Sequence, residues 1–474
     1  MEFSTSPMRD DPILDAFDLL ARRDPSAPLV ATRRISVSRG EIDAWAGAAA
    51  EMLAACGAPR GAYVLLASVN GAGFLAALLG ARRAGLVPIL ADWASPEAER
   101  ARVAEALDVA ARIECGEAFP DSPASFRVDR CDGTPAYAPE GAAYVKLTSG
   151  SSGLPSGVAI AAEALAADDD QLSAAMGLRS SDRFVAAIPW SHSYGLSSLV
   201  MPALRRGSLL IVPDDTSPWA PLDSARALEA TVFPTVPVYL QTIASLAVPP
   251  VWPPTLGTVI SAGAPLRPET AARFRETFGR DAHVFYGASE CGGIAYDPEG
   301  GAALRGTVGR PIDGVRIALD DDGAVSVRSP AVGLRHVPDG DDRLGDGVFR
   351  SADLAAWTAQ GELALIGRVD ALINVGGKKV HPHEIETVLR AMPGVREAFV
   401  LGVPASGDER TLVRAFVACD PASVSYAAVA SWCRERLAGH KVPRSIVRLP
   451  EIPRNARGKI DRTALAAWKP AEGR

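Results

Sequence analysis

Apolar and polar positions follow two periods along the first two thirds of the chain. Short apolar runs, such as Ala62–Ser68 and Val87–Ala91, predict buried strands. Between them, apolar residues recur at helical spacing, as in Glu41–Cys56, Gly71–Ala84 and Glu163–Met176. Strands that alternate with helices in this way predict an α/β fold with parallel sheets covered by helices on both faces.

The pattern changes twice in the last third. From Gly301 to Leu365, short strands with Asp-Gly turns predict a small antiparallel β unit. Beyond Gly367, a helix at Pro382–Met392, two strands and a helix at Tyr426–Leu437 predict a compact α+β unit of about a hundred residues, a usual domain size. We therefore expect two domains, residues 1–367 and 368–474.

Composition narrows the class of protein. The chain has 474 residues, 48% of them hydrophobic and 22% charged, as in an enzyme with a large core, and its net charge of −7 disfavours a nucleic-acid binder. Its six cysteines form no C-x-x-C pair, and its N-terminus has no apolar signal core, so we expect a cytoplasmic protein. Residues 230–266 carry no charge, but prolines interrupt them, which predicts buried core or an apolar pocket wall and no membrane span.

Residues 144–157 read Tyr-Val-Lys-Leu-Thr-Ser-Gly-Ser-Ser-Gly-Leu-Pro-Ser-Gly, a strand followed by a loop of small residues. The exposed amides and hydroxyls of such a loop can surround phosphate oxygens. The residues concerned are Thr148, Ser149, Gly150, Ser151, Ser152 and Gly153. A flexible linker is the alternative, but the preceding strand and Leu154-Pro155 favour phosphate binding. The spacing is not that of a Walker P-loop, and position 156 is Ser156.

This loop resembles the Thr-Ser-Gly-Thr-Thr-Gly-x-Pro-Lys-Gly signature of the adenylate-forming (ANL) superfamily, which includes the acyl- and aryl-CoA ligases (AMP-binding enzymes). Ser156 stands where that signature has lysine. Four more segments resemble the family's motifs, in the family's order: Tyr286-Gly287-Ala288-Ser289-Glu290, Phe349-Arg350-Ser351-Ala352-Asp353-Leu354, Gly367 to Val380, and Pro453 to Arg462 with Gly458-Lys459-Ile460-Asp461-Arg462. Ser261-Ala262-Gly263-Ala264-Pro265 is similar to the segment beside the adenine.

The resemblance implies a large N-terminal domain of two αβαβα sheets plus a small β unit, and a small mobile α+β C-terminal domain. It also implies that ATP or AMP is bound by the loop residues above and by Gly263, Ala264, Pro265, Tyr286, Gly287, Ser289, Asp353, Arg368 and Lys459. Glu290 would hold Mg²⁺, a cation that prefers oxygen ligands. The implied catalytic residues are Lys459, Glu290, His192 and Arg368; Asp370 is the implied hinge, and Gly376, Gly377 and Lys379 face the thiol.

Single residues in these motifs also have ordinary interpretations. A five-residue strand end such as Tyr286–Glu290 has no necessary function, and a lone Asp353 is more often a turn or cap residue. His381 and His383 could suggest a metal pair, but Pro382 near the first helical position favours a helix start. The shared order of the motifs is what favours the nucleotide site.

The implied reaction is activation of a carboxylic acid by ATP to an acyl-adenylate, followed by thioester formation with CoA and release of AMP and pyrophosphate. The implied acid pocket is lined by His192, Val238, Ala262, Gly287, Gly293 and Ile294, small or apolar groups that suit an aromatic or medium aliphatic acid. No aspartate lies between Pro189 and Leu196, which disfavours an α-amino acid. For His192 three roles remain open: it gates the pocket, it orients the acid, or it only packs against neighbouring side chains.

Two alternatives remain open at this point. The thiol acceptor could be the phosphopantetheine of a separate acyl carrier protein instead of CoA. The chain could also be a nucleotide-binding pseudoenzyme, an interpretation that the loss of the loop lysine at Ser156 supports. If the chain is active, we expect weaker ATP binding or more reliance on Mg²⁺ and Lys459. As partners we expect the acid, ATP and CoA, no nucleic acid and no membrane, in a monomer or homodimer.

Overall fold

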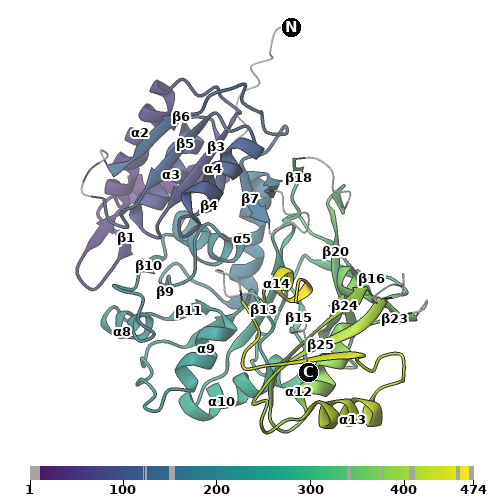
Figure 1. Ribbon diagram of the computed structural model, residues 1–474. Helices are drawn as coiled ribbons and strands as arrows, with labels where there is room; N and C mark the ends of the chain where they lie inside the picture. The colour runs from purple at the N-terminus through teal and green to yellow at the C-terminus, as the bar shows by residue number, and fades with distance from the viewer. Residues whose placement is uncertain are drawn as a thin grey trace. The chain divides into compact units, whose positions relative to one another are not determined.

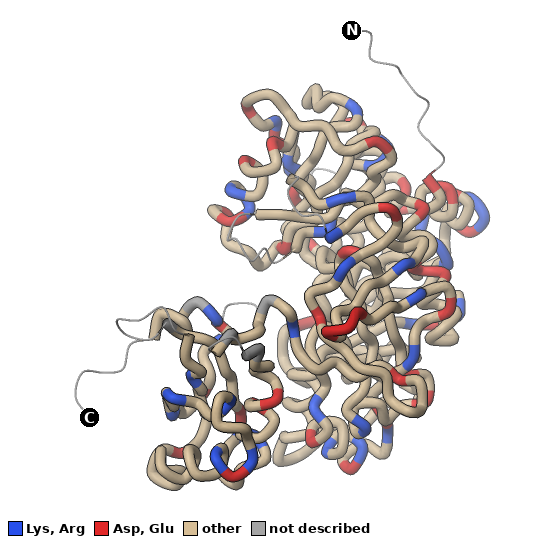
Figure 2. The backbone as a smooth tube through the Cα atoms, turned by 90° about the vertical axis from the view of Figure 1, so that its right-hand side faces the viewer, with Lys and Arg blue, Asp and Glu red and all other residues tan. Residues whose placement is uncertain are grey.

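The computed structural model describes residues 11–120, 122, 125–148, 155–338, 343–375, 378–404, 411–454 and 460–468. The chain divides into two compact units. The large unit comprises Met1–Ala318, Ser326–Arg350 and Trp357–Ala364, and the small unit comprises Leu319–Val325, Ser351–Ala356 and Leu365–Arg474. Acidic and basic residues are interspersed along both units (Figure 2).

The first sheet of the large unit has the strand order β18-β8-β7-β4-β3-β5-β6. Its strands are β3 (Tyr63–Ser68), β4 (Val87–Asp92), β5 (Ala111–Cys115), β6 (Arg127–Arg130), β7 (Tyr144–Thr148), β8 (Ser156–Ile160) and β18 (Arg335–Val337). The central strands are parallel, whereas β6, β8 and β18 pair antiparallel with their neighbours. The predicted parallel core is therefore present, but the sheet has antiparallel edges that the alternation of elements did not indicate.

The second sheet has the order β15-β14-β13-β12-β11-β9-β10-β1-β2. Its strands are β1 (Pro28–Ala31), β2 (Ser36–Ser38), β9 (Arg183–Val185), β10 (Leu209–Ile211), β11 (Val232–Thr235), β12 (Thr258–Ser261), β13 (His283–Ala288), β14 (Gly292–Tyr296) and β15 (Arg310–Pro311). Strands β9 to β13 are parallel, and β14 turns back antiparallel to β13. The carboxyl ends of the parallel strands, where open α/β sheets bind ligands, lead into the predicted site segments.

Helices fill the connections, as Figure 1 shows. They are α1 (Pro12–Arg23), α2 (Arg39–Ala55), α3 (Ala72–Arg83), α4 (Glu97–Ala106), α5 (Ala162–Met176), α6 (Ser193–Gly195), α7 (Met201–Arg206), α8 (Ala220–Ala227), α9 (Pro237–Ala244), α10 (Pro268–Phe278) and α11 (Ala302–Arg305). Local sequence explains their starts: at α2 the Ser38 hydroxyl accepts a hydrogen bond from the Glu41 amide, and the Glu41 carboxylate accepts one from the Ser38 amide. Between α6 and α7, Leu196–Val200 form a π-helical turn.

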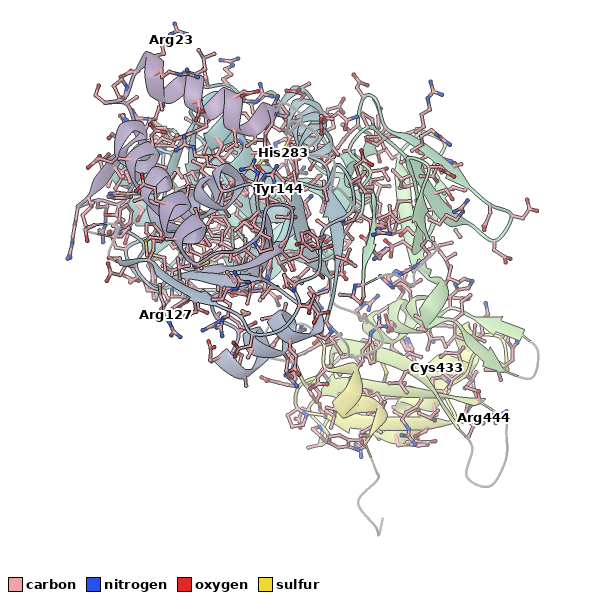
Figure 3. All side chains as sticks on the ribbon, turned by 90° about the horizontal axis from the view of Figure 1, so that it is seen from above. Arg23, Arg127, Tyr144, His283, Cys433 and Arg444 are labelled. Atoms are coloured by element: carbon pink, nitrogen blue, oxygen red, sulfur yellow. The ribbon has the colours of Figure 1, made fainter. Side chains whose placement is uncertain are left out.

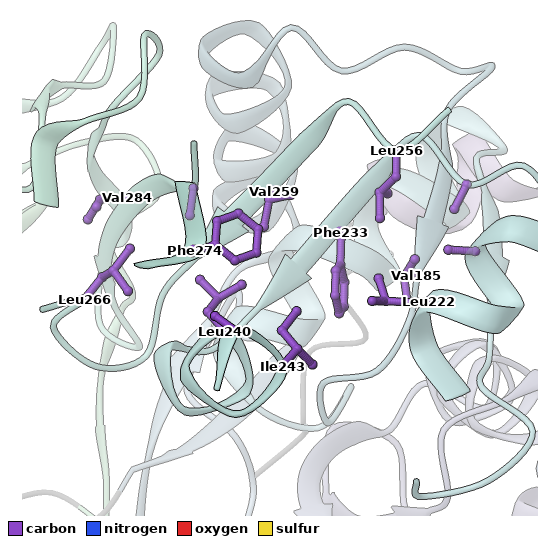
Figure 4. Packing of buried hydrophobic residues seen from close by; sticks show 14 of the residues in the cluster. Val185, Leu222, Phe233, Leu240, Ile243, Leu256, Val259, Leu266, Phe274 and Val284 are labelled. Carbon is purple, nitrogen blue, oxygen red and sulfur yellow. The ribbon is translucent and has the colours of Figure 1, made fainter. Parts of the chain in front are cut away.

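The uncharged segment 230–266 forms β11, α9 and β12. Phe233, Leu240 and Val259 pack with Leu222 and Phe274 in one buried cluster (Figure 4). Val248 and Val251, in the loop after α9, are exposed by 81% and 74%. The predicted burial therefore holds for β11, β12 and one face of α9, whereas the proline-rich loop is exposed at Val248 and Val251 and buried at Leu256.

The small unit is the α+β structure expected after Gly367. Strands β24 (Val395–Pro404), β25 (Thr411–Cys419) and β26 (Ser445–Leu449) form one sheet, beside the hairpin β22 (Ile373–Val375) and β23 (Lys378–Val380) and the helices α12 (Pro382–Arg390), α13 (Tyr426–Arg436) and α14 (Arg462–Ala466). A further five-stranded sheet joins β16 (Arg316–Leu319), β17 (Ala324–Arg328), β19 (Leu344–Gly345), β20 (Val348–Trp357) and β21 (Leu363–Arg368). In the part of the chain described, no helix is long and apolar enough to span a membrane.

Candidate active site

The Gly/Ser loop joins two antiparallel strands, β7 and β8. Thr148 lies directly opposite Ser156 in the ladder, and their hydroxyl oxygens are 2.9 Å apart. The strand after the loop was not predicted from the sequence. Ser149, Gly150, Ser151, Ser152 and Gly153, which were predicted to bind phosphate, lie outside the described residues. The loop therefore begins after Thr148, at the end of β7, and ends at Ser156, where β8 begins.

The segment Tyr286–Glu290 forms the end of β13 and the turn into β14. Tyr286 is partly exposed, and a Cβ atom at Gly287 would lie 2.7 Å from the Gly292 carbonyl oxygen, so this close approach requires glycine. The Ser289 hydroxyl lies 2.6 Å from the hydroxyl of Ser193 at the start of α6. This contact places the segment that contains His192 beside the predicted nucleotide motif.

Glu290 is partly exposed, and its carbonyl oxygen accepts a hydrogen bond of 2.8 Å from the Gly333 amide. Among the described residues, no group of three or more His, Cys, Asp or Glu side chains could hold a metal by itself. Mg²⁺ commonly binds through one or two carboxylates together with substrate phosphates. A single accessible carboxylate at Glu290 fits that mode of binding.

Two residues that the sequence analysis missed fix the segment before α6. The Asn70 side chain donates to the Ile188 carbonyl oxygen at 2.8 Å and accepts from the Trp190 amide at 3.0 Å. Asp92, the last residue of β4, places a carboxylate oxygen 3.2 Å from Nε2 of His192. Asp92 ends β4 and Asn70 lies two residues after β3, so their position at strand ends of the first sheet was the available signal.

The predicted acid-pocket residues differ in exposure. Val238 on α9 is 65% exposed and Gly287 is exposed, as are Gly263, Ala264 and Pro265 of the segment predicted to bind the nucleotide. Ala262, Gly293 and Ile294 are buried, with Ile294 fully inaccessible. Gly263 has φ of +81°, a left-handed conformation that suits glycine and turns the chain after β12. The exposed members form one group that follows β11, β12 and β13 along the sheet.

The small unit brings together Asp353 and Arg368, both predicted to contact the nucleotide. Nη1 of Arg368 lies 3.5 Å from Oδ1 of Asp353, and the Ser351 hydroxyl donates to Oδ2 of Asp353 at 3.2 Å. Asp353 is therefore held in a definite orientation at the surface of its strand.

The remaining predicted residues of the small unit are only partly described. Asp370 lies in a 3₁₀ turn, Val369–Ala371, and Lys379 lies in β23, but neither side chain is described. Gly376, Gly377 and Lys459 lie outside the described residues. His381 caps α12 and Pro382 occupies the first turn, which confirms the predicted helix start.

Comparison with known proteins agrees with this architecture. The model of the AMP-binding enzyme family matches residues 17–333, and that of the AMP-binding enzyme C-terminal domain matches residues 384–459. The chain therefore belongs to the AMP-binding enzyme family, as predicted from its motifs. The predicted ANL fold is also confirmed: ATP-bound MatB from Rhodopseudomonas palustris superimposes with a TM-score of 0.81 over 96% of this chain and 98% of its own, at 24% identity.

Among curated relatives, an oxalate–CoA ligase of Arabidopsis thaliana is 28% identical over 69% of this chain and 68% of its own length. A feruloyl-CoA synthase of an Amycolatopsis species is 27% identical over 93% of this chain and 95% of its own. The predicted enzyme class, an AMP-forming acid–thiol ligase, is confirmed by such relatives.

Proposed function

We propose that the protein joins a carboxylic acid to CoA in two steps, through an acyl-adenylate. The observation that carries this proposal is the contact between Ser193 and Ser289, which sets the His192 segment against the Tyr286–Glu290 motif at the ends of parallel strands. One motif is predicted to bind nucleotide and the other to face the acid. Their contact supports a site where the two substrates meet.

The first step makes the acid reactive. A carboxylate oxygen attacks the α-phosphorus of ATP, the bond to the β-phosphate oxygen breaks, and pyrophosphate leaves. We assign to the amides of the 148–157 loop the task of binding phosphate oxygens, and to Glu290 the task of holding Mg²⁺, which neutralises phosphate charge when bound. Lys459 would stabilise the charge that develops as the two anions meet.

The second step uses the acyl-adenylate. The thiolate of CoA attacks the acyl carbon, the acyl–phosphate bond breaks, and AMP leaves with its negative charge. We assign the thiol side to Gly376, Gly377 and Lys379, the ribose hydroxyls to Asp353, and the hinge between domains 1–367 and 368–474 to Asp370. The acceptance of hydrogen bonds by an acidic residue from ribose is a common device in nucleotide sites.

The acid is proposed to be aryl or medium aliphatic. The exposed wall residues Val238 and Gly287 are apolar or small, as the wall of a pocket for such an acid requires. His192 stands at the same end of the sheets with its imidazole paired to Asp92. We assign to His192 the role of orienting the carboxylate of the acid.

The experiment is a screen for acid-dependent formation of AMP and pyrophosphate across aryl acids and aliphatic acids of increasing length. We expect a responsive group of acids and a CoA thioester as product. Glu290→Gln should abolish the response, whereas Glu299→Gln, an exposed carboxylate outside the site, should keep it. A response only with a phosphopantetheinylated carrier protein would replace CoA as acceptor, and no response to any acid would favour a pseudoenzyme.

A further inference from the structure

Lys146, the third residue of β7, is almost completely buried. Its exposed fraction is 2%, and Tyr144 on the same strand is also inside the large unit (Figure 3). Lysine is rarely buried to this degree unless its charge is paired, because removing an ammonium from water is costly. A buried lysine two residues before the phosphate loop therefore requires an explanation.

The ladder shows which face of the sheet Lys146 occupies. Residues directly opposite each other in an antiparallel pair share a face, and so do residues two apart on one strand. Thr148 is opposite Ser156, and Lys146 is opposite Val158. Lys146 therefore lies on the same face as Ser156, the position at which the family signature has its lysine.

The same face is bordered by Glu290. A Cβ atom at Gly333 would lie 2.6 Å from Cγ1 of Val158 and 3.4 Å from the Glu290 carbonyl oxygen. The Gly333 amide also donates to that oxygen. Val158, the ladder partner of Lys146, thus lies next to the backbone of the predicted Mg²⁺ residue.

The charges of two carboxylates act on the Lys146 ammonium. Burial lowers the pKa of Lys146, while the charges of Asp168 and Glu290 and the Cys291 thiol act in the opposite direction. Of these groups, Glu290 is also placed near the ladder partner of Lys146 by the contacts of Gly333.

Asp168 is already fixed by other donors. It accepts hydrogen bonds from the Ser197 hydroxyl at 2.6 Å and from the Gly293 amide at 2.8 Å. None of the described residues accepts a hydrogen bond from the Lys146 ammonium. Its charge therefore acts on nearby charged groups through space and is not neutralised by a single close ion pair.

We propose that Lys146 is a positioning residue of the ATP site, which provides, on the face that it shares with Thr148 and Ser156, the positive charge that Ser156 does not. It balances Asp168 and Glu290, so that the triphosphate approaches a site without excess negative charge. This inference rests on the proposed assignment of the 148–157 loop to ATP. Lys146 acts through Glu290 and does not itself touch the reacting atoms.

The test is a double-mutant cycle with Lys146→Met and Ser156→Lys, in which the KM for ATP is measured at saturating acid and CoA. We expect Lys146→Met to raise this KM about tenfold, with a smaller change in kcat, since two carboxylates then face the phosphates unbalanced. Ser156→Lys should lower the KM about fivefold in the Lys146→Met background but less than about twofold in the native chain. Equal effects of Ser156→Lys in both backgrounds would overturn the proposal.

Two further measurements separate this role from a purely structural one. The rise in melting temperature on adding ATP should shrink in Lys146→Met, and the control Arg82→Met, which removes another buried cation paired with Asp11, should lose stability but keep its KM for ATP. If Lys146→Met does not fold, Lys146→Gln takes its place. Ser156→Lys in the native chain decides independently, because a tenfold or larger fall in KM there would show that no buried charge replaces the lysine.

The failure of this inference is distinguishable from that of the proposed function. Acid-dependent AMP formation by the native chain tests the function alone. An active native enzyme whose variants show no coupling between positions 146 and 156 would leave the function intact and remove the role of Lys146.

Discussion

At the scale of single residues, the site combines motif residues with partners that no motif contains. His192 was expected to gate or orient the acid, and the structure adds Asp92 as its partner at 3.2 Å. Because Nε2 of the ring faces this carboxylate, the contact favours one orientation of the imidazole.

Replacement of Asp92 should disturb that orientation. We expect Asp92→Asn to lower kcat/KM for the acid about threefold, because a partly exposed charged contact contributes about 0.2–1 kcal/mol, and to leave the KM for ATP unchanged. Steady-state kinetics with each substrate varied in turn measures both. The control is Asp215→Asn: Asp215 accepts from the Ser217 amide as Asp92 does from the Ala94 amide, but it is exposed and no imidazole pairs with it. If the two variants had equal effects, the role of Asp92 would be limited to the hydrogen bond that it accepts from the Ala94 amide.

Several residues of the candidate site could be predicted from the sequence, and others could not. Ser289, Gly287 and Asp353 were found because their motifs are local strings of residues. Asp92 and Asn70 were missed because their partners lie about a hundred positions away, and only folding brings them together. Lys146 stands in the predicted strand before the loop, but its burial arises only in the folded chain, and no local pattern around it reveals that burial.

At the scale of elements, strand ends position the site. Elements of the parallel core were predicted to within one residue: the strand at Ala62–Ser68 is β3, and the helix at Gly71–Ala84 is α3. The antiparallel strand β8 was not predicted, because the signal of the glycine-rich loop dominated that stretch. Strand β9 ends at Val185, and Asn70 holds the connection that follows it.

Asn70 therefore stabilises a connection rather than a regular element. Asn70→Ala would leave the Ile188 carbonyl and the Trp190 amide without this partner, and unsatisfied buried groups cost about 1–3 kcal/mol each. We expect the free energy of unfolding to fall by ~2 kcal/mol in urea titration and the KM for the acid to rise. Asn70→Asp offers a graded comparison, because a carboxylate still accepts from Trp190 but cannot donate to Ile188. An alanine variant as stable as the native chain would show that solvent satisfies these groups.

At the scale of the whole molecule, the residues predicted to carry out the ligase reaction are divided between the two units. Glu290 and the phosphate loop belong to the large unit, whereas Asp353, Arg368 and the 453–462 motif belong to the small one. The family and fold were predictable because five motifs occur in order over most of the chain. The identity of the acid was not, because it depends on the depth and shape of a pocket formed by residues far apart in sequence.

The division of labour between the units gives the last prediction. If Lys459 stabilises charge only as the acid meets ATP, Lys459→Ala should abolish acid-dependent pyrophosphate release by several orders of magnitude. The same variant should still convert a synthetic acyl-adenylate and CoA to the thioester at a rate within about threefold of the native enzyme, since no phosphoryl transfer occurs in that half-reaction. Pyrophosphate release and thioester formation are measured separately on one preparation.

Lys441→Ala is the control, because Lys441 is paired with Glu384 in the same unit and its replacement should leave both half-reactions unchanged. Equal loss of both half-reactions in Lys459→Ala would mean that this lysine serves the whole cycle, and the assignment of one unit's lysine to one step would be wrong.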